Sequence, residues 1–218
     1  MNPQTMLEYV LGAWAHTYEF DLLGNQQDPV DELAYILLSA KTRDATFRRT
    51  FCRLRELYPD WNDVVCAPLP ALIEILGSGG LQVKKALWLQ SSLAEIRRRE
   101  GAVDLSRLHC LDDQEMEAYL RGLPGVGIKS ARCIMMYSFH RQVLPVDAHV
   151  FRTMGRLGLL PIGATYRGSH NTAQELVPAQ LRLDFHVYAV IHGRKTCLPR
   201  NPPCDSCCLV EWCPRVGV

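Results

Sequence analysis

A glycine-rich turn between two helical patterns constrains the fold more than any other feature of this chain. Residues 123–131 read Leu-Pro-Gly-Val-Gly-Ile-Lys-Ser-Ala. A helical pattern over 113–121 precedes the turn, and a second helix is expected to begin near Ile128. Two helices joined by so short a link form an antiparallel hairpin. Gly125 and Gly127 are expected to adopt backbone angles closed to other residues and to let another backbone approach closely.

The start of the second helix predicts a binding site for an anion. The first N–H groups of a helix have no partners within it, and the helix dipole favours negative charge at that end. A phosphate is therefore the expected guest, with Lys129 beside it in the first turn. The alternative from spacing alone is an ordinary corner between helices with a solvated lysine.

Helical periodicity also dominates the rest of the chain. Apolar residues recur at spacings of three and four without convincing strand alternation, so the fold class is predicted to be all-α. Asp28-Pro29 is a helix start signal, and Asp44 and Asp147 are each predicted to cap a helix. Further helical patterns cover 6–17, 68–76, 82–99, 171–177 and 181–192.

Composition sets bounds on the partner and the compartment. The 218 residues can form one large domain or two small ones, and a formal net charge of +1 does not by itself indicate nucleic acid. If DNA is the partner, the positive charge must be concentrated on one face. No apolar run reaches membrane-spanning length, and the N-terminus lacks a secretory signal. We therefore expect an intracellular protein whose cysteines do not form disulfides. If the protein is bacterial, it is expected in the cytoplasm or nucleoid.

Four cysteines near the C-terminus have the spacing of a metal centre. Cys197, Cys204, Cys207 and Cys213 read C-x6-C-x2-C-x5-C in a proline-rich segment that has few helix signals. Four thiolates suit either structural zinc or an iron–sulfur cluster. Zinc ribbons usually have two close pairs of cysteines, and the single close pair here favours a cluster. Cys208 is interpreted as a spare thiol because it adjoins Cys207.

The remaining cysteines and the histidines give weaker signals. Six histidines show no credible metal-ligand spacing: His16, His109, His140, His170, His186 and His192. The cysteines outside the cluster fall in helical or linker patterns and are expected to be small core residues: Cys52, Cys66, Cys110 and Cys133.

Together these features resemble the endonuclease III branch of the helix-hairpin-helix DNA glycosylases. The resemblance spans nearly the whole chain and is carried by residues 123–131, by Val146-Asp147-Ala148-His149, and by His192-Gly193-Arg194 leading into the spaced cysteines. It implies two lobes. A six-helix lobe over 23–141 would end in the hairpin, and 1–22 plus 142–218 would form a second helical lobe with a 4Fe–4S loop over 197–213. A cleft between the lobes would take one extruded nucleotide.

The resemblance also implies an activity. The protein would be a bifunctional DNA glycosylase and AP lyase of base excision repair that removes oxidised pyrimidines. Lys129 would be the nucleophile, forming a Schiff base before β-elimination cuts the strand, and Asp147 would stabilise the transition state. From the residues alone, a plain helix N-cap is the favoured role of Asp147.

Further residues are expected to contact double-stranded DNA that contains a damaged base or an abasic site. Gly125 and Gly127 would bind its backbone. Leu81, in Gly79-Gly80-Leu81-Gln82, matches the position of the family's wedge residue, although a buried turn leucine fits the sequence equally well. Lys41 stands where the family commonly has glutamine, so the choice of base can differ. The protein is expected to be a monomer.

Three alternatives remain at this stage. One is a glycosylase of the same superfamily for alkylated or mismatched bases. Another is a DNA-binding module without catalytic activity. The third is a zinc protein that uses the same four cysteines.

Overall fold

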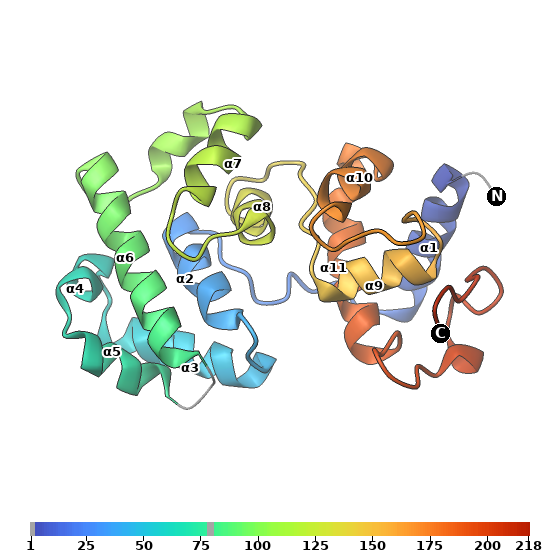
Figure 1. Cartoon of the computed structure of the whole chain (residues 1–218), viewed down its shortest axis with the longest axis horizontal. Helices are drawn as coiled ribbons and strands as arrows, with labels where there is room; N and C mark the ends of the chain where they lie inside the picture. Colours follow the sequence, from blue (N-terminus) through green and yellow to red (C-terminus); the bar gives the residue numbers. More distant parts are fainter. Residues whose placement is uncertain (1–2, 78–80) are drawn as a thin grey trace. The chain divides into compact units, whose positions relative to one another are not determined.

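The structure is a computed structural model that describes residues 3–77 and 81–218, and helices are the only regular elements in those two ranges (Figure 1). The chain divides into two compact units. One unit is Met1–Gly24 together with Gln142–Val218, and the other is Asn25–Arg141. The predicted boundaries, 23–141 against the rest, lie within two residues of these. The all-α class is confirmed.

The unit formed by Asn25–Arg141 contains the hairpin. Its described residues form seven α-helices, one more than expected, because the short α4 escaped the pattern. A 3-10 turn, Ser106–Cys110, precedes α7. The helices are α2 (Pro29–Ser39), α3 (Asp44–Leu57), α4 (Trp61–Cys66), α5 (Leu69–Leu76), α6 (Gln82–Glu100), α7 (Asp113–Arg121) and α8 (Ile128–Tyr137).

Helix α2 is the centre of this unit. Asp28 caps it as predicted, since its side chain accepts hydrogen bonds from the N–H groups of Val30 and Asp31. Almost every residue that follows is buried, because α3, α6 and α8 all pack against the helix. Tyr35 makes edge-to-face contacts with Phe47 and Phe51 of α3, with ring centroids 4.9 and 5.4 Å apart.

The predicted cap of α3 is wrong by one residue. Arg43 occupies the N-cap position without a side-chain cap, and Asp44 is the first helical residue. Asp44 instead pairs with Arg48 one turn later, at 2.7 Å between Oδ2 and Nε. An acidic group in the first turn still stabilises the helix through the dipole and this i,i+4 pair.

The other unit joins the two ends of the chain. It contains α1 (Pro3–Thr17), α9 (Ala148–Arg156), α10 (Ser169–Leu176) and α11 (Arg182–Lys195), with 3-10 turns at Ala179–Leu181 and Cys204–Ser206. Helix α11 packs against α9 and α1. Leu7, Val10 and Trp14 form the buried face of α1, and the Trp14 ring lies 5.6 Å from that of Phe185.

The expectation that the scattered cysteines are core residues holds only for Cys133. Cys52, Cys66 and Cys110 are exposed, because each lies on the solvent side of its element. Their small size and hydrophobicity fit a core equally well, so the local sequence did not distinguish the two faces. Within the described parts of the chain, no helix combines the length and the apolar character needed to cross a bilayer.

Candidate active site

The hairpin forms where the sequence predicts it. Helix α7 ends at Arg121 and α8 begins at Ile128, as expected. A capping box starts α7: the Asp112 side chain accepts the N–H of Glu115, and the Glu115 carboxylate accepts the N–H of Asp112. Buried Arg132 of α8 reaches back to Glu117 of α7, with Nε 2.8 Å from Oε2. This ion pair connects the two helices of the hairpin.

The two glycines of the turn have different roles. Gly125 has a φ of +79°, and a Cβ built there would lie 2.5 Å from Cγ of Trp88. Only glycine fits, because the turn lies directly against α6, where Ser92 also donates a hydrogen bond to the carbonyl of Pro124 at 2.7 Å.

Gly127 does not adopt the backbone angles predicted for it. Its φ is −93°, an angle that any residue adopts, and it is the N-cap of α8 without a side-chain cap. A Cβ at Gly127 would meet no atom of the described residues within 4 Å. Because residue 127 has no side chain, none of its atoms blocks the approach of an anion to the start of α8.

Lys129 lies in the first turn of α8, half-buried, and a buried carboxyl group of the same unit acts on it. Glu32 of α2 is 0% exposed, and its Oε2 accepts the N–H of Gln26 at 2.6 Å. Its Oε1 has no hydrogen-bond partner among the described residues. Burial raises the pKa of Glu32 to about 8, although the Gln26 N–H and the positive charge of Lys129 act to lower it.

Asp147 is the N-cap of α9, in the other unit, as the sequence indicates. Its Oδ1 accepts the N–H groups of His149 and Val150, both at 2.8 Å. The cap therefore requires only one of the two carboxylate oxygens. Burial lowers the pKa of His149, and the negative charge of Asp147 partly offsets this effect. Helices α9 and α11 touch here, since a Cβ at Gly193 would lie 2.7 Å from Cβ of His149.

The two predicted DNA-reading side chains both belong to the hairpin unit. Leu81 is 37% exposed and has a φ of +58° at the N-cap of α6. Gly79 and Gly80 lie outside the described residues. Lys41 is exposed, also with positive φ, in the turn after α2. The amine of buried Lys85 fixes that turn by donating to the carbonyl of Leu38 at 2.6 Å and to the hydroxyl of Thr42. Burial lowers the pKa of Lys85.

The four spaced cysteines meet around a single hollow. A hollow of about 30 Å³ is lined by all four, together with residues of α9 and α11. Besides the sulfurs, the lining combines leucine, valine and proline side chains with five polar ones, from Thr153, Arg156, His192, Thr196 and Arg215. Four thiols around one hollow are the donor set that an iron–sulfur cluster requires, so these residues fit the group. The four are Cys197, Cys204, Cys207 and Cys213.

Two residues that sequence reasoning did not select support this centre. Arg156, nearly buried, donates to Sγ of Cys197 at 3.2 Å and to the carbonyl of Leu198 at 2.7 Å. Burial alone would raise the pKa of Cys197, but hydrogen bonds from His192 and Arg156 lower it to about 7. A guanidinium beside a sulfur favours the thiolate, which is the form that binds iron.

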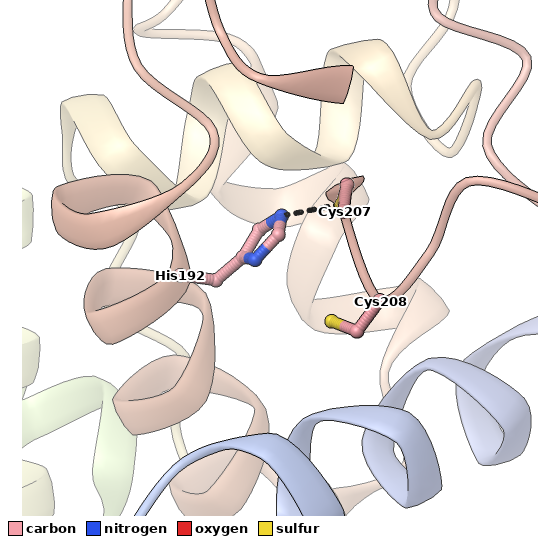
Figure 2. Close-up of side chains that lie close together, drawn as sticks. All are labelled: His192, Cys207 and Cys208. Atoms are coloured by element: carbon pink, nitrogen blue, oxygen red, sulfur yellow. Dashed lines mark hydrogen bonds between the residues drawn. The ribbon is translucent and has the colours of Figure 1, made fainter. Parts of the chain in front are cut away.

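His192 corrects the expectation that the histidines are unrelated to a metal site. Figure 2 shows its ring extending from α11 toward Cys207, with Nε2 4.0 Å from Sγ. Its Nδ1 is 2.9 Å from the hydroxyl of Tyr18. The ligand atoms of His192, Cys207 and Cys208 lie within 4.8 Å of one another. Cys208 does not line the hollow of the four spaced cysteines, although its sulfur lies close to that of Cys207.

Comparison with known proteins identifies the family to which the chain belongs. No protein-family model matches the chain. A protein of Arabidopsis thaliana described as a DNA glycosylase is 29% identical over 169 residues, which are 78% of this chain but only 58% of that protein. Endonuclease III of Escherichia coli K12 is 31% identical over 190 residues, covering 87% of this chain and 85% of the relative.

Similarity to solved structures points to the same family as the sequence comparison. An endonuclease III trapped as a covalent intermediate with DNA has a TM-score of 0.85 and 26% identity, covering 99% of this chain and 97% of that one. With this structural match, and with the identity and coverage of the Escherichia coli relative, the chain belongs to the endonuclease III family of DNA glycosylases.

Proposed function

We propose that the protein is a bifunctional DNA glycosylase and AP lyase of base excision repair, with Lys129 as its nucleophile. The observation that carries the proposal is the place of Lys129 in the first turn of α8, directly after the glycine turn and beside an uncovered helix start. A primary amine at this point lies next to the site expected to hold a phosphate. The covalent DNA intermediate of a solved relative supports an amine that bonds to the sugar.

The reaction follows from an amine that attacks deoxyribose. The nitrogen of Lys129 bonds to C1′ while the bond from C1′ to the base breaks, and the base leaves with the electron pair and gains a proton. Opening of the sugar ring gives an imine between C1′ and the nitrogen. The imine makes the C2′ proton acidic, and its removal expels the 3′ phosphate as the bond from C3′ to oxygen breaks. The strand is thereby cut on the 3′ side.

Asp147 is proposed to stabilise the positive charge that develops on the sugar as the base leaves. A carboxylate held in a fixed orientation is well suited to that task. The cap on α9 holds the side chain in one orientation, because Oδ1 accepts two backbone hydrogen bonds. Capping and catalysis are therefore compatible roles for this residue.

Borohydride trapping tests the nucleophile. The wild-type protein, incubated with a duplex that contains an oxidised pyrimidine, is expected to give a covalent adduct on reduction. Lys129→Ala should abolish the adduct, whereas Lys84→Ala, which removes an exposed lysine at the start of α6, should leave it unchanged. A Lys129→Ala protein that still forms the adduct would refute the assignment.

The same assay separates the candidate substrates. We propose oxidised pyrimidines, and a panel of duplexes with oxidised, alkylated or mismatched bases measures the preference directly. Trapping only on alkylated or mismatched bases would favour the alternative glycosylase. Tight binding to abasic DNA without strand cleavage would favour a non-catalytic binding module.

We infer that the hollow in the C-terminal loop holds a 4Fe–4S cluster. Its ligands would be the thiolates of Cys197, Cys204, Cys207 and Cys213, with Arg156 donating a hydrogen bond to the first. Base excision transfers no electrons, so the group would serve to hold the loop folded. A preparation with broad visible absorption, iron and acid-labile sulfide supports the cluster, and zinc without sulfide excludes it.

The remaining predicted contacts concern the place of the extruded base. Leu81 is proposed to fill the gap left in the stack, which its exposed apolar side chain at the tip of α6 allows. Lys41 is proposed to face the stack from the turn fixed by Lys85. The partner is double-stranded DNA with a damaged base or an abasic site.

A further inference from the structure

A basic groove runs along α3, apart from the hairpin but in the same unit. The volume of this groove is about 650 Å³. Figure 1 labels α3, the helix along which the groove runs. The cations of its lining are Lys41, Arg43, Arg49 and Arg53. The hydroxyls of Thr42, Thr46 and Thr50 lie between them, and residues 75–77 at the end of α5 complete the wall. The lining contains no aspartate or glutamate among the described residues.

The sequence of α3 builds this groove by separating two faces of one helix. Phe47, Phe51 and Leu54 are buried, and the two phenylalanines contact Tyr35 of α2. The groove-lining positions of the helix are 46, 49, 50 and 53, which follow the i, i+3, i+4, i+7 spacing of a single face. Hydroxyls and guanidinium groups therefore alternate along one exposed stripe.

The positive charge of this stripe is not neutralised within the described structure. Two other arginines of α3 have carboxylate partners, Arg48 with Asp44 and Arg55 with Asp31. Arg43, Arg49 and Arg53 have no carboxylate within ion-pair distance among the described residues, and all three are exposed. In a chain whose formal net charge is only +1, such a local excess of cations is a strong electrostatic feature.

From these observations we propose that the α3 groove binds the phosphodiester backbone of duplex DNA, as a second contact besides the hairpin. The proposal rests on the proposed function, since it assumes that duplex DNA is the substrate. Guanidinium groups bind phosphate through two parallel hydrogen bonds. The hydroxyls of Thr42 and Thr50 already donate to the carbonyls of Ala40 and Thr46, so the arginines carry the proposed contact. The hairpin offers neutral N–H groups, whereas the groove provides the cations that release counterions from DNA.

The salt dependence of binding measures such contacts directly. Each phosphate neutralised by an arginine adds about 0.9 to the slope of log K against log salt concentration. Replacing Arg49 and Arg53 by glutamine should therefore lower the magnitude of the slope by about 2. If the affinities converge near 1 M salt, the double variant should bind roughly 60-fold more weakly at 0.1 M salt.

The experiment uses the full chain and a fluorescent duplex that contains a tetrahydrofuran abasic analogue, which is not cleaved. Anisotropy titrations at several salt concentrations compare Arg49→Gln, Arg53→Gln and the double variant with Arg48→Gln. Arg48 is the matched control, because it lies on the same helix but pairs with Asp44 outside the groove. Circular dichroism verifies that each variant is folded.

A slope that decreases by about 1 for each groove arginine, and stays unchanged for Arg48→Gln, supports the proposal. Equal slopes for all proteins, or an equal decrease for the control, would overturn it. A loss seen with single-stranded oligonucleotide but not with duplex would overturn it as well. Failure of the proposed function is a different result: wild-type protein that gives no borohydride adduct on any lesion duplex, whatever its salt slope.

Discussion

Replacing Glu32 by glutamine should stabilise the protein by an amount that depends on pH. Glu32 is completely buried, and only its Oε2 is hydrogen-bonded among the described residues. Burial raises its pKa from 4.5 to about 8. Below pH 4.5 the side chain is protonated in both the folded and the unfolded chain, so ionisation has no effect on stability.

Between pH 4.5 and 8 only the unfolded chain releases the proton of Glu32. The free energy of unfolding of the wild type should therefore fall by about 1.36 kcal/mol per pH unit in this window and level off above it. Since pH 7 lies 2.5 units above 4.5, the loss there is about 3 kcal/mol. Glutamine keeps the size of the side chain and an oxygen for the Gln26 N–H but does not ionise.

Thermal unfolding of wild type and Glu32→Gln at pH 5, 6, 7 and 8 measures the effect. At pH 5 the two proteins should differ by less than about 1 kcal/mol, and at pH 7 the variant should melt roughly 6–12 °C higher. The control is Glu56→Gln, on the exposed side of α3, where a change within about 0.5 kcal/mol is expected at each pH. Parallel curves for wild type and Glu32→Gln across this range would refute the reasoning.

Three further predictions concern the hairpin, the cap and the metal centre. Gly125→Ala should lower the free energy of unfolding by about 2–5 kcal/mol in urea titrations, because the new Cβ would clash with Trp88 and the residue has a positive φ. Gly127→Ala, the control, should lower it by less than about 1 kcal/mol. Equal losses would contradict this. Asp147→Asn should change the free energy of unfolding by less than about 0.5 kcal/mol, since asparagine caps a helix equally well. It should slow single-turnover base excision at least about 100-fold. Unchanged excision would show that Asp147 serves only as a helix cap. The Cys204→Ala protein should lose its bound iron and its visible absorption, and its C-terminal loop should become sensitive to protease. Full retention of iron would exclude Cys204 as a ligand.

Local signals were sufficient for the hairpin. Helix α7 begins and ends at the predicted residues and α8 begins at the predicted one, because Asp112, Gly122 and the glycine turn act within a few residues of themselves. The same holds for the caps at Asp28 and Asp147. The shift at Asp44 shows the limit of this reasoning, since an acidic residue suits both the N-cap and the first turn of a helix.

Features that depend on packing between distant segments could not be predicted. The burial of Glu32 results from α3, α6 and α8 closing around α2, and the only sequence signal was an acidic residue within an apolar helical run. Lys85 and Arg156 looked like ordinary surface residues until the carbonyls they bind were located. His192 gave no signal of a place beside the metal centre, because it precedes the cysteine segment at a spacing typical of no ligand set.

The construction of one unit from both ends of the chain has a consequence for synthesis. Helix α1 leaves the ribosome long before the rest of its unit, yet its Trp14 packs on Phe185, and Tyr18 bonds to a histidine 174 residues later. At roughly 5–20 residues per second, the apolar face of α1 waits about ten to thirty seconds for its partner. The contiguous unit of Asn25–Arg141 is translated completely in that interval. Nascent chains of which all residues up to Arg141 have left the ribosome should therefore contain a folded hairpin and an α1 whose apolar face is still exposed.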